Sequence, residues 1–305
     1  MRYGPLGTTG LNVSRIGLGG WTFGGGYDWG PIEFKDIADT VNAALETGIN
    51  LIDTAPVYGS SEEALGMALK GKRSHVILST KCGLIKNGSW AEHNLKSATI
   101  TKQLENSLKN LQTDVIDLYL IHYLDPATPW QEVLHTLQQL QTQGKIRYIG
   151  ACNIPADVLT EMVKTGLISC VQDEFSLLHC QKAKQIVKIC QDKKLGFISY
   201  GSLCGGILSG KYKKEPNLRR ADARNYFYKC YRGQNFLNTR PVLQRLSNLA
   251  AKKGVSAAQI ALAWLLHQPG ITCALTGARN PQQIIQNAQA AQLAFSAEEL
   301  CNLQK

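Results

Sequence analysis

The sequence predicts an α/β fold: a single (β/α)8 barrel of the TIM type that takes up the whole chain, residues 1–305, with an N-terminal β-hairpin and long loops at its C-terminal face. Short runs of β-type residues alternate with runs at helical spacing, and this alternation is typical of βα units around a parallel sheet. It gives eight strand-type runs, and no linker or shift in composition divides them between two domains. Polar side chains follow several of these runs, as in barrels whose reactive groups lie at the strand C-terminal ends.

The expected elements follow one another along the chain. Residues 2–13, broken by glycines and a proline, are predicted to form the hairpin. Between the seventh strand and its helices, residues 201–238 form a connection too long for an ordinary βα loop, which makes it a candidate functional loop. The eight strand-type runs are residues 14–18, 50–53, 76–80, 116–121, 147–150, 169–172, 196–200 and 272–275. Helical signals follow them at 37–45, from 60, at 104–111, 130–140, from 155, at 186–189, 242–253, 257–267 and from 281, where the last helix is expected.

Length and composition describe an ordinary globular protein. The chain has 305 residues, of which 44% are hydrophobic and 18% charged, as is typical of soluble domains. No apolar run reaches the roughly 18 residues that a membrane span requires, and the N-terminus lacks the apolar stretch of a secretory signal. We therefore expect a cytoplasmic protein with no membrane partner.

Charge and cysteine usage argue against several other classes. The net charge is +10, but the basic residues are spread out and no nucleic-acid motif accompanies them, so no nucleic-acid partner is expected. The densest basic region, residues 211–224, suits either a solvated face or a site for a compact anion. The nine cysteines are scattered without metal-ligand spacing, so neither a disulfide framework nor a metal is expected. Nothing indicates an obligate protein partner.

Four polar side chains near strand ends indicate an active site. Asp53 ends the second strand, and Pro56 forces a turn that carries Tyr58. Lys81 and His122 directly follow the third and fourth strands. We expect the four to meet at one end of the barrel, where they suit proton delivery to a carbonyl oxygen while hydride reaches the carbon. Because no side chain carries hydride, a nicotinamide cofactor is implied.

The proton donor would be a tyrosine, whose usual pKa lies near 10. Lowering that pKa to about 7 requires roughly 4 kcal/mol. A lysine ammonium about 4 Å away supplies on the order of 4 kcal/mol at an effective dielectric of 20. We therefore expect Lys81, held charged by Asp53, to make Tyr58 acidic, and His122 to donate a hydrogen bond to the substrate oxygen.

Several motifs make the chain resemble the aldo-keto reductases over almost its whole length. In chain order they are GINLIDTAPVYG, ILSTKCG, IDLYLIHYLD, GKIRYIGACNI, VQDEFSLL, SYGSLCGGILSGKY and LTGARNPQQIIQN. The resemblance implies NADPH-dependent reduction of a small aldehyde or ketone to an alcohol. It assigns Tyr58 as the general acid, Asp53 and Lys81 as the pair that tunes it, and His122 as the group that orients the carbonyl.

The resemblance also implies where the cofactor, NADPH or NADP+, would lie. Asn153 and Gln172 match the groups that bind the carboxamide, and Tyr200 matches the ring that stacks on the nicotinamide. Arg279 matches a group near the 2′-phosphate, which would favour NADP over NAD because a guanidinium fits phosphate oxygens. The other positions expected at the cofactor are Gly20, Trp21, Asp53, Gly201, Leu203, Gly205, Lys211, Arg224, Gly277, Gln283 and Asn287.

Two other functions remain open on the sequence. One is a cofactor-binding regulatory protein of the same fold with little turnover, similar to potassium-channel β subunits; the complete set of four polar residues favours the reductase. The other is a Schiff-base lyase that uses Lys81, which the expected nicotinamide site disfavours. Cys152 and Asp173 stand where the family usually has Ser and Asn, which leaves the cofactor affinity open.

Overall fold

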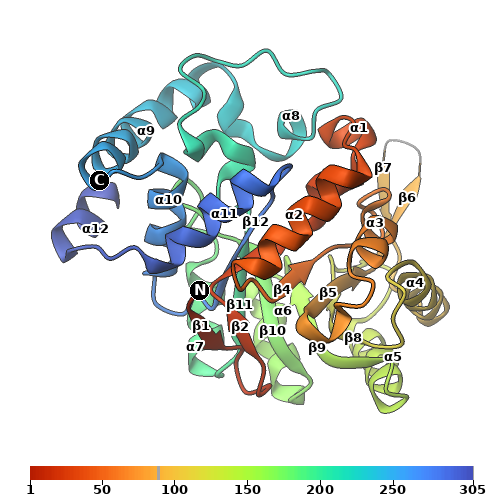
Figure 1. Cartoon of the computed structure of the whole chain (residues 1–305). Helices are drawn as coiled ribbons and strands as arrows, with labels where there is room; N and C mark the ends of the chain where they lie inside the picture. Colours follow the sequence, from red (N-terminus) through yellow and green to blue (C-terminus); the bar gives the residue numbers. More distant parts are fainter. Residues whose placement is uncertain (88–89, 305) are drawn as a thin grey trace.

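Parallel strands close into a barrel in the part of the chain that the structure describes, residues 1–87 and 90–304 (Figure 1). The structure is a computed structural model. Around the barrel the order is β10 (Ile168–Glu174), β11 (Gly196–Tyr200), β12 (Cys273–Thr276), β3 (Ile16–Gly19), β4 (Leu51–Asp53), β5 (Ile77–Cys82), β8 (Ile116–Ile121) and β9 (Ile146–Cys152). Neighbouring strands pair in parallel throughout. The predicted (β/α)8 barrel is therefore confirmed.

The N-terminal hairpin closes the end of the barrel where the strands begin. Its strands β1 (Tyr3–Pro5) and β2 (Asn12–Ser14) pair antiparallel, as predicted. Leu6, between them, is fully buried against the first residue of β11: a Cβ added at Gly196 would lie 2.3 Å from Leu6 Cδ1. The hydroxyl of Tyr148 on β9 donates a hydrogen bond to the carbonyl of Thr9. With this end plugged, the opposite end is the one left for a site.

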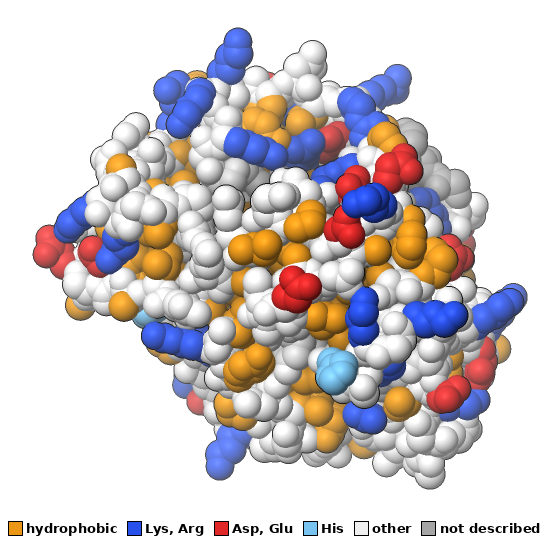
Figure 2. Space-filling model, viewed as in Figure 1, with side chains coloured by type: hydrophobic (Ala, Val, Ile, Leu, Met, Phe, Trp, Pro, Cys, Tyr) orange, Lys and Arg blue, Asp and Glu red, His pale blue; other side chains and the backbone are white. Residues whose placement is uncertain are grey.

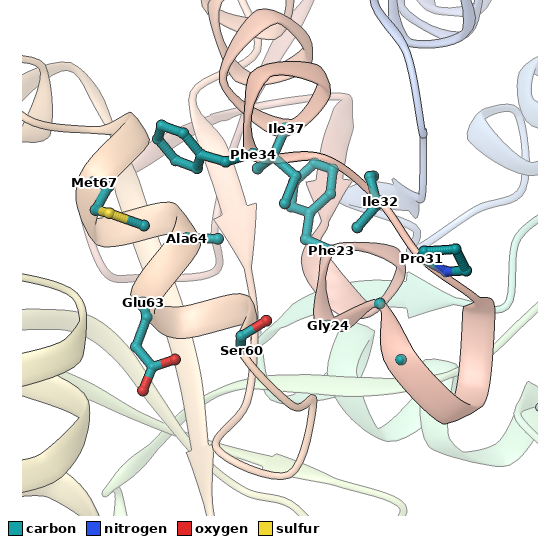
Figure 3. Close-up of a pocket in the computed structure, with 12 residues that line it drawn as sticks. Phe23, Gly24, Pro31, Ile32, Phe34, Ile37, Ser60, Glu63, Ala64 and Met67 are labelled. Atoms are coloured by element: carbon teal, nitrogen blue, oxygen red, sulfur yellow. The ribbon is translucent and has the colours of Figure 1, made fainter.

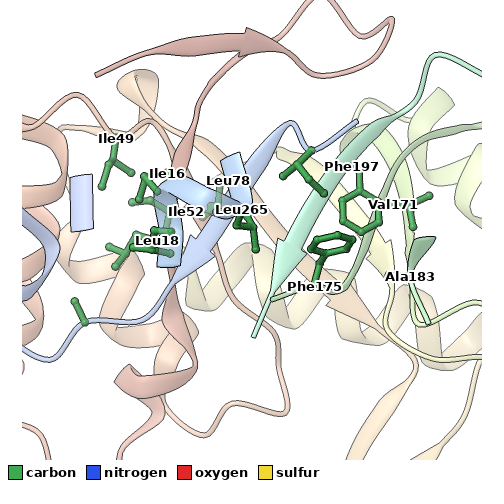
Figure 4. Packing of buried hydrophobic residues seen from close by; sticks show 14 of the residues in the cluster. Ile16, Leu18, Ile49, Ile52, Leu78, Val171, Phe175, Ala183, Phe197 and Leu265 are labelled. Atoms are coloured by element: carbon green, nitrogen blue, oxygen red, sulfur yellow. The ribbon is translucent and has the colours of Figure 1, made fainter. Parts of the chain in front are cut away.

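Helices surround the barrel and bury its outer face. They are α2 (Phe34–Glu46), α3 (Ser61–Ala68), α4 (Ser97–Asn110), α5 (Trp130–Thr142), α6 (Ala156–Met162), α7 (Lys184–Asp192), α9 (Gly233–Lys253), α10 (Ala257–Leu266), α11 (Pro281–Gln289) and α12 (Ala297–Gln304). Apolar side chains of the strands pack in one cluster with those of the surrounding helices and loops. Figure 4 shows, among others, Ile16, Leu18, Ile52 and Phe197 of the strands, Leu265 of α10, and Ile49 and Phe175 of the loops. A second, smaller apolar cluster that includes Leu118, Leu120, Ile198 and Leu275 joins the strands to Leu6 of the hairpin.

Three elements differ from the expectation. A second hairpin, β6 (Leu84–Asn87) with β7 (Trp90–His93), follows β5 and was not predicted. Helix α9 begins at Gly233 rather than near residue 242. It continues through Pro241, although a proline lacks the backbone N–H and so removes one helical hydrogen bond. Buried Phe236 and Thr239 anchor this first part of α9. The helix expected to be last, α11, is followed by α12, which packs against α9.

The long connection after β11 folds over the C-terminal face. It contains the turns η4 (Cys204–Ser209) and η5 (Lys229–Tyr231) and the short helix α8 (Arg224–Phe227). Figure 1 shows α8 beside α1 (Gly26–Trp29), and the amide of Ala223 donates to the carbonyl of Asp28 at 2.9 Å. On the side of the molecule that Figure 2 shows, Lys and Arg side chains are scattered rather than gathered in one stripe. Across the described ranges, the search for a helix long and apolar enough to span a bilayer is negative.

Candidate active site

A buried ion pair forms the floor of the site. Lys81 on β5 places its Nζ 2.7 Å from Oδ2 of Asp53, the last residue of β4, and 2.8 Å from the carbonyl oxygen of Thr54. The other carboxylate oxygen of Asp53 accepts from Ser79 Oγ and from Gln172 Nε2, each at 2.8 Å. Lys81 is fully buried and Asp53 is 4% exposed. The pair is therefore fixed by neighbours on three strands, β4, β5 and β10.

Tyr58 lies above this pair on the turn after β4. Its amide donates to the carbonyl of Ala55 at 3.0 Å. The turn packs so closely on Gly24 that a Cβ there would lie 2.0 Å from the carbonyl oxygen of Tyr58, so only glycine fits position 24. Lys81 Nζ lies 4.9 Å from the centre of the Tyr58 ring. The two expected partners, phenol and ammonium, are thus neighbours.

The pKa of Tyr58 moves in the direction opposite to the expectation from sequence. Burial raises it to about 12, although the ammonium of Lys81 acts to lower it. The sequence estimate counted the charge of Lys81 and left out desolvation, which disfavours the charged phenolate. At neutral pH the hydroxyl is therefore protonated and has a proton to give.

The pKa values of Lys81 and His122 define the charges around this hydroxyl. Burial acts to lower the pKa of Lys81, but the charges of Asp53 and Tyr58 together raise it by more. The net change is upward, and the ammonium stays charged. Burial, and then Lys81, lower the pKa of His122 well below its usual value. His122 is therefore neutral and keeps one ring N–H to donate. Its ring lies edge-on to Tyr58, with centroids 5.8 Å apart.

A cavity of about 760 Å³ opens over this floor, a size typical of small-molecule and cofactor sites. Three of the four expected catalytic residues line it, namely Asp53, Tyr58 and His122, whereas Lys81 lies beneath them. Gly20 packs behind the wall, because a Cβ there would lie 2.7 Å from Ser61 Oγ. The other expected cofactor residues all line the cavity: Trp21, Asn153, Gln172, Tyr200, Gly201, Leu203, Gly205, Lys211, Arg224, Gly277, Arg279, Gln283 and Asn287.

Near the floor, amide groups and an aromatic ring are held in place together. Asn153 has the left-handed backbone conformation, with φ of 56°, and donates from Nδ2 to the carbonyl of His122 at 3.0 Å. The Tyr200 hydroxyl donates to Asn153 Oδ1 at 2.7 Å. Gln172 is oriented by Asp53. These groups fit a ligand that has both an amide and a flat ring, as a nicotinamide does.

Another part of the cavity wall carries positive charge. Lys211, Arg224 and Arg279 line it, and the electrostatic influence of Arg219 and Arg224, after burial, lowers the pKa of Arg279. Asp222 neutralises Arg224 in part, with Nη2 and Oδ2 2.6 Å apart. Arg219 and Arg224 thus repel the charge of Arg279, and a bound anion would relieve that repulsion. This part of the wall therefore fits the phosphates of a dinucleotide.

The sequence placed the substrate pocket on loops that include residues 21–30, 123–130 and 217–238, but it did not single out several residues of these loops that line the wall, chiefly Asp28, Trp29, Tyr123, Phe227 and Tyr228. Trp21 contacts Trp29 and Phe227 edge-on, with centroids 5.2 and 4.9 Å apart. Trp21 Nε1 also donates to Asp28 Oδ2 at 3.2 Å. These residues lie on loops and one-turn helices with no period or motif, so the aromatic residues themselves, beside the glycines at 24–26, were the available signal.

A second cavity, of about 290 Å³, lies on the other side of the glycine-rich loop (Figure 3). It runs between α2 and α3 and is bordered by apolar side chains, with Glu63 and Ser60 at one side. None of the residues expected at the active site or the cofactor lines it.

Over the described ranges, no cluster of three or more His, Cys, Asp or Glu side chains is arranged to hold a metal ion. All cysteines are free thiols, and most are buried. Burial raises the pKa of Cys82, the neighbour of Lys81, to about 12, which makes it unreactive as a thiolate at neutral pH.

The barrel, its buried Lys–Asp pair and the adjoining phenol define a class of oxidoreductase rather than a lyase, because Lys81 is neither neutral nor open to a substrate. Residues 15–305 match the aldo/keto reductase family. The chain belongs to that family, and is thus an oxidoreductase of small carbonyl compounds that uses a nicotinamide cofactor.

Relatives of the chain have names that state different activities. The chain is 38% identical to the aldo-keto reductase YhdN of Bacillus subtilis, over 93% of this chain and 87% of that one. It is 33% identical to the NADH-specific methylglyoxal reductase of Escherichia coli, over 96% and 94%. The glycerol dehydrogenase AKR11B4 of Gluconobacter oxydans superposes with a TM-score of 0.87 at 32% identity, covering 96% of this chain and 91% of that one. Cofactor preference therefore has to be argued from this chain's own residues.

Proposed function

We propose that this protein reduces an aldehyde or ketone to an alcohol with NADPH, with Tyr58 as general acid. The observation that carries the proposal is the position of Lys81 Nζ, 2.7 Å from Asp53 and 4.9 Å from the centre of the Tyr58 ring, on the floor of a cavity large enough for a dinucleotide. Regulatory proteins of the same fold also retain much of this set of residues, so measured turnover is what separates the two functions.

In this proposal each residue acts on a stated proton or charge. The nicotinamide, when bound, supplies hydride to the carbonyl carbon. The Tyr58 hydroxyl gives its proton to the carbonyl oxygen, and the ammonium of Lys81 stabilises the phenolate that remains. Asp53 and the carbonyl of Thr54 hold Lys81 charged and in place. Neutral His122 donates a hydrogen bond that polarises the same oxygen without protonating it.

NADPH rather than NADH is proposed because the cationic wall holds more positive charge than a pyrophosphate alone requires. Lys211, Arg224 and Arg279 line the wall, and Arg219 lies close enough to influence Arg279. Arg279 uses two guanidinium N–H groups on the carbonyls of Trp29 and Pro31. Its remaining N–H groups could donate to phosphate oxygens. The relative from Escherichia coli is named NADH-specific, so this preference is the part of the proposal that most needs measurement.

The experiment is a turnover assay followed at the absorbance of the reduced nicotinamide, with NADPH or NADH and a panel of aldehydes and ketones. We expect steady consumption of NADPH. We expect Tyr58→Phe to lower kcat/KM by about 10³-fold, the range for loss of a general acid, while NADPH binding measured by fluorescence stays within about twofold. Near-normal turnover of Tyr58→Phe would show that another group gives the proton. Tight binding without turnover of any carbonyl would favour the regulatory alternative.

A further inference from the structure

Residues 25–32 form a segment between the two cavities. Asp28 and Trp29 line the large cavity. Gly25, Gly26, Pro31 and Ile32 line the small one, with Pro31 and Ile32 labelled in Figure 3. The segment thus borders both cavities, and it forms part of the wall of the large one beside Trp21 and Tyr58.

Local structure does little to fix this segment. Gly25, Gly26 and Gly30 all have positive φ, at 57°, 57° and 78°, where glycine is conformationally free. A Cβ at Gly26 would meet nothing within 4 Å. The indole N–H of Trp29 is buried and has no hydrogen-bond partner among the described residues. Contacts from outside the segment therefore hold it. Trp21 Nε1 and the amide of Ala223 each donate a hydrogen bond to Asp28.

The tie on residues 29–31 comes from Arg279, a residue distant in sequence that precedes α11. Its Nη1 donates to the carbonyl oxygen of Trp29 at 2.5 Å, and its Nη2 donates to the carbonyl oxygen of Pro31. Hydrogen bonds from a charged donor are stronger than those between neutral groups. The remaining guanidinium N–H groups stay available on the side of the large cavity, which Arg279 also lines.

We propose that Arg279 is a positioning residue for the carbonyl substrate: it clasps residues 29–31 and so holds Trp29 and Asp28 against the large cavity. In its kinetic consequence the inference rests on the proposed reductase function. The side chain of Arg279 then links the positively charged part of the cavity wall to the part formed by Asp28 and Trp29. Loss of Arg279 releases the segment toward the smaller cavity and enlarges the space beside Trp21.

Hydrogen–deuterium exchange on the protein without ligands tests the clasp directly. The amides of Trp29 and Gly30 donate to the carbonyls of Gly25 and Gly26, so they report whether α1 stays folded. In Arg279→Ala we expect their exchange to be about tenfold faster, because two charge-assisted hydrogen bonds are lost. Arg279→Lys keeps the charge without the fork and should fall between Arg279→Ala and the unchanged protein.

Lys211→Ala is the matched control, since it removes another cation of the same wall, one whose Nζ lies 4.9 Å from the centre of the Tyr212 ring rather than on the two carbonyls that Arg279 bonds. It should leave exchange at residues 29 and 30 within twofold, and exchange in β8 should be unaltered in every variant, which excludes general unfolding. Unchanged exchange at residues 29 and 30 in Arg279→Ala would overturn the clasp.

A kinetic measurement separates this inference from the proposed function. At saturating nicotinamide, Arg279→Ala should raise KM for the carbonyl compound by at least about threefold while kcat changes less. Arg240→Ala, which removes an exposed arginine of α9 that lines neither cavity, should not. If KM for the carbonyl stays unchanged at saturating cofactor, the positioning role is refuted even though the enzyme turns over. If no carbonyl is reduced at all, the proposed function fails and the exchange result still decides whether the clasp exists.

Discussion

The floor and the rim of the large cavity are built in different ways. The floor consists of Asp53, Tyr58, Lys81, His122 and Gln172, and the polar atoms of its ion pair are bonded within the barrel. The rim consists of residues 25–32, 201–232 and 277–279. It contains glycines with positive φ and side chains that are largely exposed, such as Phe227 at 59%.

This difference separates the reaction from the choice of ligands. Charges at strand ends in a closed barrel have little freedom, so they can hold a proton donor within hydrogen-bond reach of a carbonyl. Loops held by a few contacts, such as those of Arg279, can change their lining without disturbing the floor. We therefore expect floor substitutions to abolish activity and rim substitutions to redirect it.

The largest effect is expected for Lys81→Met. It removes the charge that stabilises the phenolate, so kcat/KM should fall by at least about 10³-fold. It also leaves Asp53 buried without its cation, which should lower the free energy of unfolding by about 3–5 kcal/mol. Kinetics and denaturant titration measure the two losses.

A double variant separates those two losses. Adding Asp53→Asn to Lys81→Met removes the uncompensated charge but keeps an oxygen that accepts from Ser79 and Gln172, so stability should return in part while activity does not. Recovery of activity with stability would mean that the pair acts only through folding.

A smaller effect, specific to one cofactor, is expected at the rim. Arg279→Ala should weaken NADPH binding by about 10–100-fold, the equivalent of one lost charge-assisted hydrogen-bonded contact, and NADH binding by less than about threefold. Lys211→Ala should weaken both cofactors alike, since the pyrophosphate is common to them. Calorimetric titration measures each affinity, and equal losses for Arg279→Ala would rule out a 2′-phosphate contact.

The floor could be read from the sequence because each of its residues ends or follows a strand. Asp53, Lys81 and His122 follow apolar runs, and parallel strands of a barrel bring such ends together. The same reasoning found Asn153, Gln172 and Tyr200, all of which line the cavity. What it could not supply was burial: the estimate for Tyr58 used one charge, whereas desolvation outweighs that charge.

The rim could not be read in the same way. Trp29 and Phe227 reach the cavity because Arg279 and Ala223 tie two loops together, and such contacts have no sequence period. Gly20 was grouped with the cofactor residues, yet the structure packs it behind the wall against Ser61. The second hairpin, β6 and β7, was missed because its strands are short and partly polar.

A modest effect is expected for Phe227→Ala. The ring packs on Trp21 and is otherwise largely exposed, so the free energy of unfolding should change by less than about 0.5 kcal/mol. KM for bulky apolar carbonyls should rise by roughly 2–10-fold, the equivalent of one aromatic contact, and small aldehydes should be little affected. Tyr226→Ala is the control, because that exposed neighbour is absent from the cavity lining; matching effects in both variants would mean that Phe227 does not contact substrate.

The smallest expected effect is that of pH on kcat/KM, which tests the pKa of Tyr58. A general acid works only while protonated, so activity is present below its pKa and is lost as the pH rises through it. Because burial raises the pKa of Tyr58 to about 12, kcat/KM for reduction of a non-ionising carbonyl should stay flat between about pH 6 and 10. The lowered pKa of His122 keeps that side chain neutral over the same range. A tenfold fall per pH unit starting near 7 would show that the charge of Lys81 outweighs burial after all.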